Sequence, residues 1–349
     1  MPAENVIIES PRIPTVPETM ARPLWSVMIP TYNAGELLRT TLQSVLAQDP
    51  GPDRMQIEVV DNCSTNDDPE TLAKSLAGDR VSFYRRAQND GPIVNFNECI
   101  RRSRGHLVHI LHSDDYVLPG FYQEVERLGQ MHPDTALLAT RCFAVDEAGV
   151  IKDVSQRVRE LEAGGHCARP LYYDTVMQFP SVVIRRKFYE EHGGFLPHIV
   201  HAADREMWAR AISLGGGVIS TEVLSCYRVS KSNESAKMFR TGENVRDLLR
   251  VAEVFRRTYP DFSPTLARQM AAYLALQQAH RFSAINDQEA AQNNLKLWQG
   301  NGLWLDRVKE FIRPMVRKVS GRSAWQASSS NPRLKTSGRS TLRQPGTTL

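Results

Sequence analysis

The sequence predicts an α/β protein in which a mostly parallel sheet is flanked by helices and followed by a C-terminal helical extension. Apolar runs of strand length alternate with amphipathic helical segments up to about residue 131, and the pattern turns wholly helical after residue 244. Repeated β-α-β units require a parallel sheet with right-handed crossovers. The 349 residues are 41% hydrophobic and 23% charged, which is typical of a globular chain with a substantial core.

The first part of the chain supplies four expected strands, over residues 25–29, 57–60, 81–84 and 107–111. The helices between them cover residues 36–48, with apolar side chains on one face, then 69–76, which begins with proline, and 92–104, which Gly105 ends. A fourth helix is expected over Phe121–Met131.

Beyond Pro133 the pattern loosens. Strands are expected over residues 136–145, 181–184 and 218–227, and helices over Arg186–His192 and 204–214. Residues 153–180 give no clear period, and residues 244–298 are helical, with Ser263 and Pro264 as an N-cap pair. We therefore expect a disordered leader (1–22), an α/β domain (23–235), a helical extension (236–312) and a basic disordered tail (313–349).

Charge and cysteine content narrow the compartment and the partners. From residue 311 onward there are eight Lys or Arg and no acids, so the remainder carries 4 − 8 = −4. The five cysteines lack C-x-x-C spacing, which argues against disulfides or zinc and for a reducing compartment. With no signal peptide and no apolar stretch of about 20 residues, we expect a cytoplasmic protein.

The tail lacks a nucleic-acid module, so specific nucleic-acid binding is not expected. Attraction to an anionic membrane at its inner face and a merely solvated tail both stay open.

Polar residues follow three of the expected strands, at residues 30–33, 61–65 and 113–115. Because parallel strands share a direction, these ends should gather at one edge of the sheet, where open α/β sheets bind ligands. A turn, an Asx-turn and a helix cap would each explain one of them alone. Carboxylates here suit Mg²⁺ or Mn²⁺, which bind phosphate oxygens. An α/β nucleotide-binding oxidoreductase is disfavoured because no G-x-G-x-x-G follows the first strand.

Several ordered motifs now carry a family resemblance over residues 24–230. They are Ser26-Val-Met-Ile-Pro-Thr-Tyr-Asn33, Ile57-Glu-Val-Val-Asp-Asn-x-Ser-Thr65, Leu111-His-Ser-Asp-Asp115, Gly193-Gly194-Phe195, Ala203-Asp204-x-x-x-Trp208-x-Arg210 and Tyr227-Arg228. Together they resemble the inverting GT-A glycosyltransferases of the family 2 type, which use nucleoside-diphosphate sugars. The resemblance implies a Rossmann-like GT-A sheet.

The same resemblance implies roles for individual residues. The residues expected to bind the donor are Pro30, Thr31, Asn33, Asp61, Asn62, Asn97, Ser113 and Asp114. Asp114 is expected to ligate Mn²⁺ or Mg²⁺. His112 replaces the first acid of the D-x-D motif, so the metal is expected to rest on one carboxylate, with Asp115 in support.

Asp204 is expected to be the catalytic base, with Ala203 in place of the usual neighbouring acid. An N-cap on the helix that follows is the alternative for Asp204.

The expected reaction is metal-assisted single displacement from a nucleoside-diphosphate sugar to a hydroxyl acceptor. The acceptor is expected to be a cell-envelope glycan, a lipid-linked sugar or a secondary metabolite. The main alternative is a catalytically inactive nucleotide-sugar-binding protein of the same fold.

Overall fold

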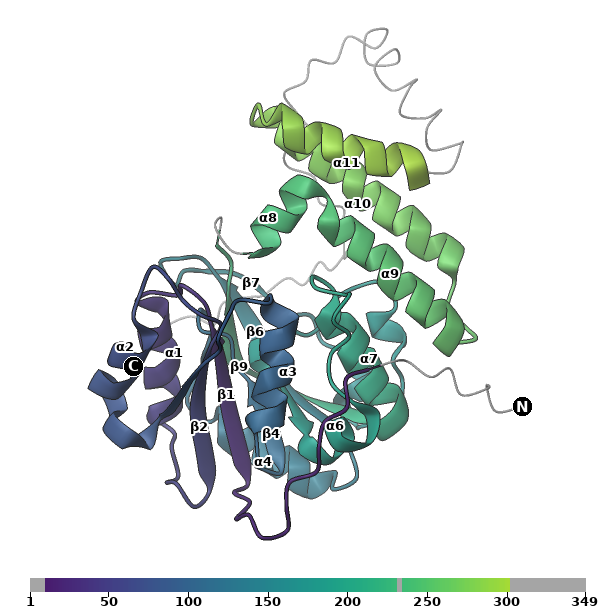
Figure 1. The fold of residues 1–349 in the computed structure, drawn as a ribbon. Helices are drawn as coiled ribbons and strands as arrows, with labels where there is room; N and C mark the ends of the chain where they lie inside the picture. Colours follow the sequence, from purple (N-terminus) through teal and green to yellow (C-terminus); the bar gives the residue numbers. More distant parts are fainter. Residues whose placement is uncertain (1–9, 231–233, 302–349) are drawn as a thin grey trace, which may run out of the picture. The chain divides into compact units, whose positions relative to one another are not determined.

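The computed structural model describes residues 10–230 and 234–301 (Figure 1). Its strands form one sheet in the order β3-β2-β1-β4-β8-β6-β9-β5, with β7 paired to β6. The first four strands are β1 (Trp25–Thr31), β2 (Met55–Asp61), β3 (Ser82–Arg85) and β4 (Leu107–Ile110). They pair in parallel, which confirms the β-α-β prediction for this half of the sheet.

The second half of the sheet is mixed. It contains β5 (Tyr116–Val117), β6 (Leu137–Val145), β7 (Ile151–Val154), β8 (Val182–Arg185) and β9 (Gly217–Arg228). Strand β8 runs antiparallel to both β4 and β6, whereas β9 runs parallel to β6 and antiparallel to β5. The sheet is therefore parallel over β1–β4 and mixed beyond, because β8 enters between β4 and β6 in the opposite direction.

Helices cover both faces of the sheet, and the alternation of strand residues explains why. In β1, Val27 and Ile29 face one buried cluster while Met28 faces the other. Helices α1 (Leu37–Leu46), α2 (Pro69–Ala77) and α4 (Phe121–Met131) contribute to the first cluster. Helices α3 (Pro92–Arg102), α6 (Arg186–His192) and α7 (Ala203–Gly215) contribute to the second.

The segment without a clear sequence period is largely irregular. It holds one short helix, α5 (Arg159–Glu162), and 3₁₀ turns at Arg169–Leu171 and Phe179–Ser181. Isolated apolar residues such as Leu161 and Met177 anchor it in the second cluster. Single anchors spaced this far apart produce neither a helical nor a strand period.

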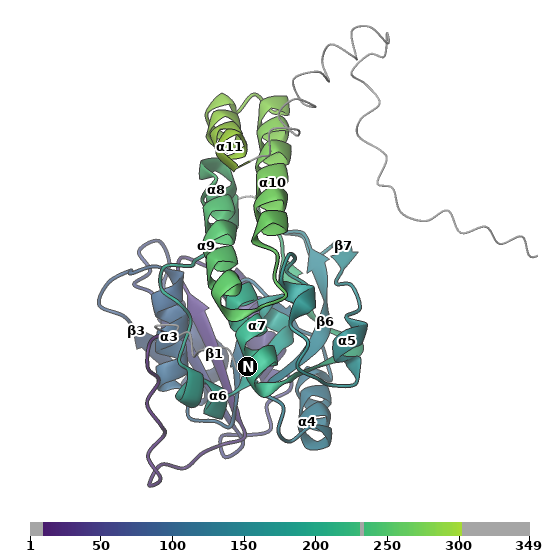
Figure 2. The same ribbon diagram turned by 90° about the vertical axis from the view of Figure 1, so that its right-hand side faces the viewer.

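Over residues 234–301 the structure has four helices after β9: α8 (Glu234–Thr241), α9 (Glu243–Thr258), α10 (Pro264–Ala284) and α11 (Gln288–Asn301). The Leu266 N–H donates to Ser263 Oγ (3.2 Å), which confirms the predicted N-cap. Helix α10 packs against both α9 and α11 (Figure 2). Val251 and Phe255 of α9 join the second cluster of the α/β domain, so the two regions share a core. Within residues 10–230 and 234–301, no helix has the length and apolarity to cross a bilayer.

Residues 10–22 correct the expectation of a disordered leader. Ser10 Oγ donates to the His192 carbonyl (2.8 Å), and the Gly194 N–H donates to the Pro11 carbonyl (2.9 Å). Ile13 is buried in the second cluster. Its prolines keep the segment extended, so that its carbonyls meet donors on the domain surface. Residues 1–9 and the predicted tail lie outside the described part of the chain.

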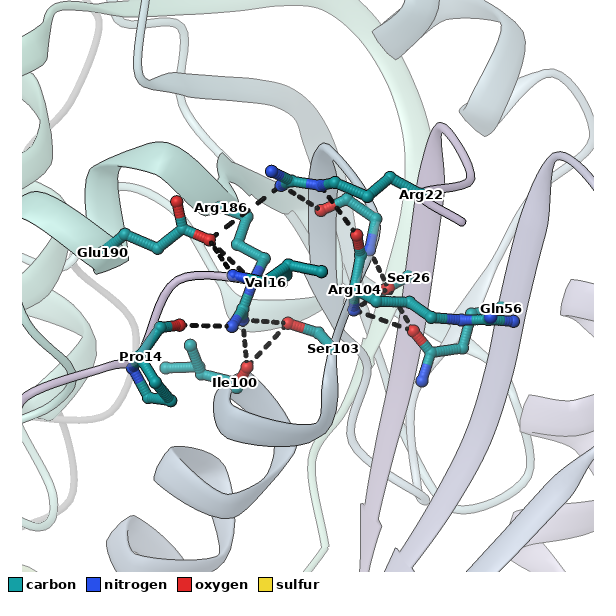
Figure 3. Close-up of polar contacts among 11 residues, drawn as sticks. Pro14, Val16, Arg22, Ser26, Gln56, Ile100, Ser103, Arg104, Arg186 and Glu190 are labelled. Atoms are coloured by element: carbon teal, nitrogen blue, oxygen red, sulfur yellow. Dashed lines mark hydrogen bonds and ion pairs between the residues drawn. The ribbon is translucent and has the colours of Figure 1, made fainter. Parts of the chain in front are cut away.

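Arg186 ties this leader to the domain (Figure 3). Its buried guanidinium donates to the Ile100 carbonyl, to Ser103 Oγ (2.8 Å) and to the Pro14 carbonyl (2.9 Å). Arg186 Nε also pairs with Glu190 (3.1 Å). The arginine therefore joins the leader to the end of α3 and to its own helix.

Candidate functional site

The carboxyl ends of β1 and β2 are locked together at one edge of the sheet. The Asn62 N–H donates to the Thr31 carbonyl (2.9 Å), and the Asn33 N–H donates to Ser64 Oγ (2.9 Å). Asn33 has a positive φ of 51° and accepts the Thr65 N–H at its Oδ1 (2.8 Å). The left-handed backbone that asparagine tolerates turns this loop back across the sheet edge.

The third predicted strand end lies at the same edge. Thr41 Oγ1 in α1 donates to the carbonyl of Asp115 (2.6 Å) and lies 3.0 Å from that of Ser113. Helix α1 begins just after the β1 loop, so one buried hydroxyl joins the β1 loop to the segment after β4. The three strand ends are thus brought together, as the sequence predicts.

Asp61 and Asn62 build the wall of this edge. The Asp61 carboxylate is fully buried and accepts from Ser64 Oγ (2.6 Å) and Arg85 Nε (2.6 Å). Asn62 accepts from Arg86 Nη1 (2.7 Å) and donates to Asn89 Oδ1 (2.7 Å). Both side chains therefore hold the loops that follow β2 and β3.

Thr31 offers a free polar atom. It ends β1, its side chain is buried, and its Oγ1 has no hydrogen-bond partner among the described residues. Pro30, which precedes it in β1, pairs with Val60 of β2. A buried hydroxyl at a strand end is available to a ligand in a way that the Asp61 carboxylate is not.

Both polar side-chain atoms of Asn97 are occupied by a contact with Phe195. Its Nδ2 donates to the Phe195 carbonyl (2.9 Å), and its Oδ1 accepts the Phe195 N–H (2.8 Å). A Cβ on Gly194 would lie 2.2 Å from Asn97 Oδ1, which explains the glycine. Asn97 is therefore a clamp between α3 and the Gly193–Gly194 turn, and its amide does not join the predicted donor residues.

His112, Asp114 and Asp115 form a cluster with candidate ligand atoms that lie within 4.8 Å of one another. Arg228 braces it from β9, since its N–H donates to Asp115 Oδ1 (2.8 Å) and its Nε to the Asp114 carbonyl (2.9 Å). Asp115 Oδ2 and His112 Nε2 have no hydrogen-bond partners in the described part of the chain.

Burial controls the protonation of this cluster. It raises the pKa of Asp114, and it raises the pKa of Asp115 well above the usual value, with the Asp114 charge adding to the effect. The His112 ring stacks on Phe96 (4.9 Å between centroids) and packs at a tilt against Phe179 (4.3 Å), and burial lowers its pKa to about 4. A neutral imidazole beside two desolvated carboxyls fits a divalent cation, which would offset the repulsion between Asp114 and Asp115.

Asp204 lies in the first turn of α7. The helix begins at Ala203 after an N-cap at Ala202, so Asp204 is not the N-cap that the sequence left open. Its Oδ1 accepts the Arg205 N–H (2.7 Å), and its side chain is buried. Burial raises the pKa of Asp204 to about 6, against the opposing effects of the Arg205 N–H and guanidinium.

Tyr227 in β9 links Asp204 electrostatically to the metal-binding candidates. Burial raises its pKa, and the negative charges of Asp115, Asp114 and Asp204 raise it further. All three carboxylates therefore lie within electrostatic reach of one phenol. The sequence marks Tyr227 only as part of a motif and gives it no role.

Asp247 of α9 is a residue that sequence reasoning missed. Its buried Oδ2 accepts the N–H groups of Val200 (2.8 Å) and His201 (2.6 Å), just before α7. The signal was available, since Asp247 occupies the same face of α9 as Val251 and Phe255, at a spacing of four. An acid in an apolar helical stripe indicates a specific partner.

Comparison with known proteins now identifies the class. Residues 26–193 match the family described as "Glycosyl transferase family 2". The chain carries a family 2 glycosyltransferase domain of the GT-A fold, and it is a glycosyltransferase.

Two relatives illustrate the sequence similarity. The chain is 28% identical over 243 residues to the uncharacterised protein MT1568 of Mycobacterium tuberculosis. This alignment covers 66% of this chain and 75% of that protein. It is 24% identical over 200 residues to the uncharacterised glycosyltransferase MJ1057 of Methanocaldococcus jannaschii, covering 56% and 66%.

Two solved structures share the fold. One is Staphylococcus aureus TarS 1–349 in complex with UDP-GlcNAc, with a TM-score of 0.55, 19% identity, and coverage of 85% of this chain and 87% of that chain. The other is the mannosyltransferase PcManGT from Pyrobaculum calidifontis in complex with GDP-Man and Mn²⁺, with a TM-score of 0.51, 16% identity, and coverage of 88% and 90%. In sequence, the chain matches only 36% of the full length of TarS.

Proposed function

We propose that this glycosyltransferase moves a sugar from a nucleoside-diphosphate sugar to an acceptor hydroxyl with inversion, and that Asp204 is the base. The observation that carries the proposal is that the charges of Asp204, Asp114 and Asp115 all act on the phenol of Tyr227, which supports one common site for the three carboxylates. Such a displacement needs a base that takes the proton of the acceptor hydroxyl, and carboxylates that hold a metal beside the diphosphate.

Asp204 has the properties of a base for this step. A single displacement requires the acceptor hydroxyl to lose its proton while it attacks the anomeric carbon. With a pKa of about 6, the carboxyl is ionised near neutral pH yet more basic than an ordinary aspartate. The helix amides at the start of α7 stabilise its anion, and no second acid precedes it because residue 203 is alanine.

The donor is proposed to bind along the edge formed by Pro30, Thr31, Asn33, Asp61, Asn62, Ser113 and Asp114. The free Thr31 Oγ1 supports a contact there, while Asp61 and Asn62 shape the loops around it. The complexes of TarS with UDP-GlcNAc and of PcManGT with GDP-Man support a nucleotide sugar as donor.

A divalent metal, Mn²⁺ or Mg²⁺, would be held by Asp114 together with Asp115 and His112. When bound, such an ion offsets the charge that grows on the departing diphosphate. The available imidazole favours Mn²⁺, because Mg²⁺ prefers oxygen ligands. The Mn²⁺ complex of PcManGT supports this choice. The expectation of one protein carboxylate is thereby extended to a three-residue cluster.

The acceptor is proposed to be a cell-envelope glycan or a lipid-linked precursor. TarS is named a poly(ribitol-phosphate) β-N-acetylglucosaminyltransferase. TuaG of Bacillus subtilis, 33% identical over 95 residues and covered over 37% of its length, is named a putative teichuronic acid biosynthesis glycosyltransferase. Both names concern cell-wall polymers. Retention of both Asp114 and Asp204 argues against an inactive binding protein.

The test is a panel of nucleoside-diphosphate sugars scored by release of nucleoside diphosphate in the presence of Mn²⁺. Nuclear magnetic resonance of the product should show the anomeric configuration opposite to that of the donor. Asp204→Asn should lower turnover by roughly 10²–10⁴-fold while donor binding persists. Asp153→Asn, an exposed residue of β7, is the matched control and should keep full turnover. Retained configuration contradicts inversion, and undiminished turnover of Asp204→Asn places the base elsewhere.

A further inference from the structure

The loop that leads into α7 lacks a cap of its own. Its N-cap residue is Ala202, which has no side-chain oxygen to accept the first free amides of the helix. The Ala202 and Ala203 methyl groups are buried in the core, and the Glu206 N–H donates to the Ala202 carbonyl (3.2 Å). These contacts fix the helix, but they leave the backbone before it to be held from elsewhere.

A carboxylate from α9 holds that backbone. Asp247 Oδ2 accepts two consecutive amides, those of Val200 (2.8 Å) and His201 (2.6 Å). Two N–H groups converging on one carboxylate oxygen fix the orientation of both peptide planes. His201 is three residues before Asp204, so this anchor lies within one helical turn of the proposed base.

The anchor is itself rigid. Asp247 is fully buried, and its Oδ1 accepts from Arg250, which also pairs with Glu243 (2.6 Å). The edge of the His201 ring meets Phe239 of α8 at 5.3 Å between centroids. Val251 and Phe255, one and two turns after Asp247, fasten α9 to the α/β core. The helices after β9 therefore hold the loop through a buried, charge-compensated contact.

We propose that Asp247 is a positioning residue for the glycosyl transfer: its carboxylate holds the 200–201 backbone so that Asp204 meets the acceptor hydroxyl. This inference rests on the proposed role of Asp204 as base. It makes α8 and α9 part of the catalytic apparatus, although Asp247 acts only through the loop. Donor binding, which lies at the ends of β1, β2 and β4, does not depend on it.

Three variants test the proposal in the full-length chain. Asp247→Ala removes both acceptor oxygens, and Asp247→Asn keeps one oxygen for the two amides. Glu253→Ala is the control on the same helix, because Glu253 is exposed and pairs with Arg256 and Arg257 of α9 itself. A displacement of the base by about 1 Å lowers turnover by about 10²-fold. Asp247→Ala should therefore lose kcat to that extent, with an unchanged KM for the donor.

Asp247→Asn should recover most of the kcat, and Glu253→Ala should retain all of it. Hydrogen exchange at the amides of residues 200 and 201 is measured in parallel and needs no turnover. These amides should lose protection in Asp247→Ala and keep it in Asp247→Asn. If the wild type transfers no sugar, the proposed function fails, while the exchange measurement still decides whether Asp247 holds the loop.

Two kinetic results would overturn the inference. One is a kcat of Asp247→Ala equal to that of the wild type. The other is an equal loss in the alanine and asparagine variants that follows the fraction of protein able to bind nucleoside diphosphate, which would mean a purely structural role. Unchanged exchange of residues 200 and 201 in Asp247→Ala counts against it in the same way.

Discussion

Replacing Asp204 by asparagine should stabilise the folded protein while it removes activity. The side chain is buried, and its pKa is raised to about 6, so the folded state prefers the protonated carboxyl. Asparagine has the shape of that neutral form and can still accept the Arg205 N–H at its Oδ1. The substitution therefore removes a desolvated charge without removing the hydrogen bond.

The magnitude follows from the two pKa values. The folded value of about 6 exceeds the ordinary 3.8 by about 2 units, and each unit corresponds to about 1.4 kcal/mol. Because the folded pKa is the higher one, the favourable contribution of the protonated carboxyl is complete below pH 3.8 and is lost as pH rises to 6. Asp204→Asn should thus raise the free energy of unfolding by about 3 kcal/mol at pH 7 and by only about 0.5 kcal/mol near pH 4.

Urea unfolding of wild type and variant at several pH values measures this difference. Asp61→Asn is the contrasting control, because the Asp61 carboxylate is buried with Arg85 and two Ser64 donors. Removing that charge should destabilise the protein by roughly 1.5–3 kcal/mol. Equal stability of wild type and Asp204→Asn at pH 7 would refute the argument that Asp204 is desolvated.

Turnover gives a second view of the same group. If Asp204 is the base, kcat at saturating substrates should be half-maximal near pH 6 and fall about tenfold for each pH unit below that value. If the base had the ordinary pKa of an aspartate, the enzyme would keep full kcat down to about pH 5. The residual activity of Asp204→Asn should show no such acid limb. A limb that persists in the variant belongs to another group.

Three further predictions concern the metal, the leader and the tail. Calorimetry with nucleoside diphosphates should show Mn²⁺-dependent binding that Asp114→Asn loses, and equal affinity with and without Mn²⁺ in both proteins would exclude the metal assignment. Arg186→Met takes the Arg186 donor from the mostly buried Glu190 carboxylate and from the carbonyls of Ile100 and Pro14, so it should cost about 3–5 kcal/mol in urea unfolding. The neighbouring Lys187→Met, at an 80% exposed side chain, should change stability by less than about 0.5 kcal/mol. Truncation after Ser320 removes five of the eight basic side chains beyond residue 310 and should weaken sedimentation with anionic vesicles at low salt, whereas equal sedimentation excludes a membrane role.

The parallel half of the sheet was predictable because its signals are local. In β1 the alternation of Val27, Met28 and Ile29 between two clusters, and in α1 the spacing of Leu38, Leu42 and Val45, record burial within a few residues. The strand ends follow from direction alone, since parallel strands deliver their last residues to one edge. Thr31 and Asp114 could therefore be placed from the sequence.

The rest depends on contacts between distant residues. The leader looked disordered because Ser10, Pro11 and Pro14 show no period, yet their polar groups meet partners more than 170 positions away. Asn97 and Phe195, which are hydrogen-bonded, lie 98 residues apart in the sequence, and an isolated asparagine does not indicate such a contact. Such pairs satisfy buried polar groups one at a time and leave no repeat to read.

The proposed base, Asp204, combines a local sequence motif with contacts from distant residues. The match to the family model ends at residue 193, eleven positions before Asp204, so Asp204 is placed only by the resemblance of its own short motif. An alanine occupies the N-cap position of its helix, and a buried acid on α9 accepts the amides of residues 200 and 201 just before it. Because α9 also supplies Val251 and Phe255 to the α/β core, substitutions that weaken its packing should act first on the loop before α7. The proposed donor side, built from β1, β2 and the segment after β4, is held by its own hydrogen bonds and should be spared. Substitutions that weaken the packing of α9 should therefore lower sugar transfer while donor binding persists.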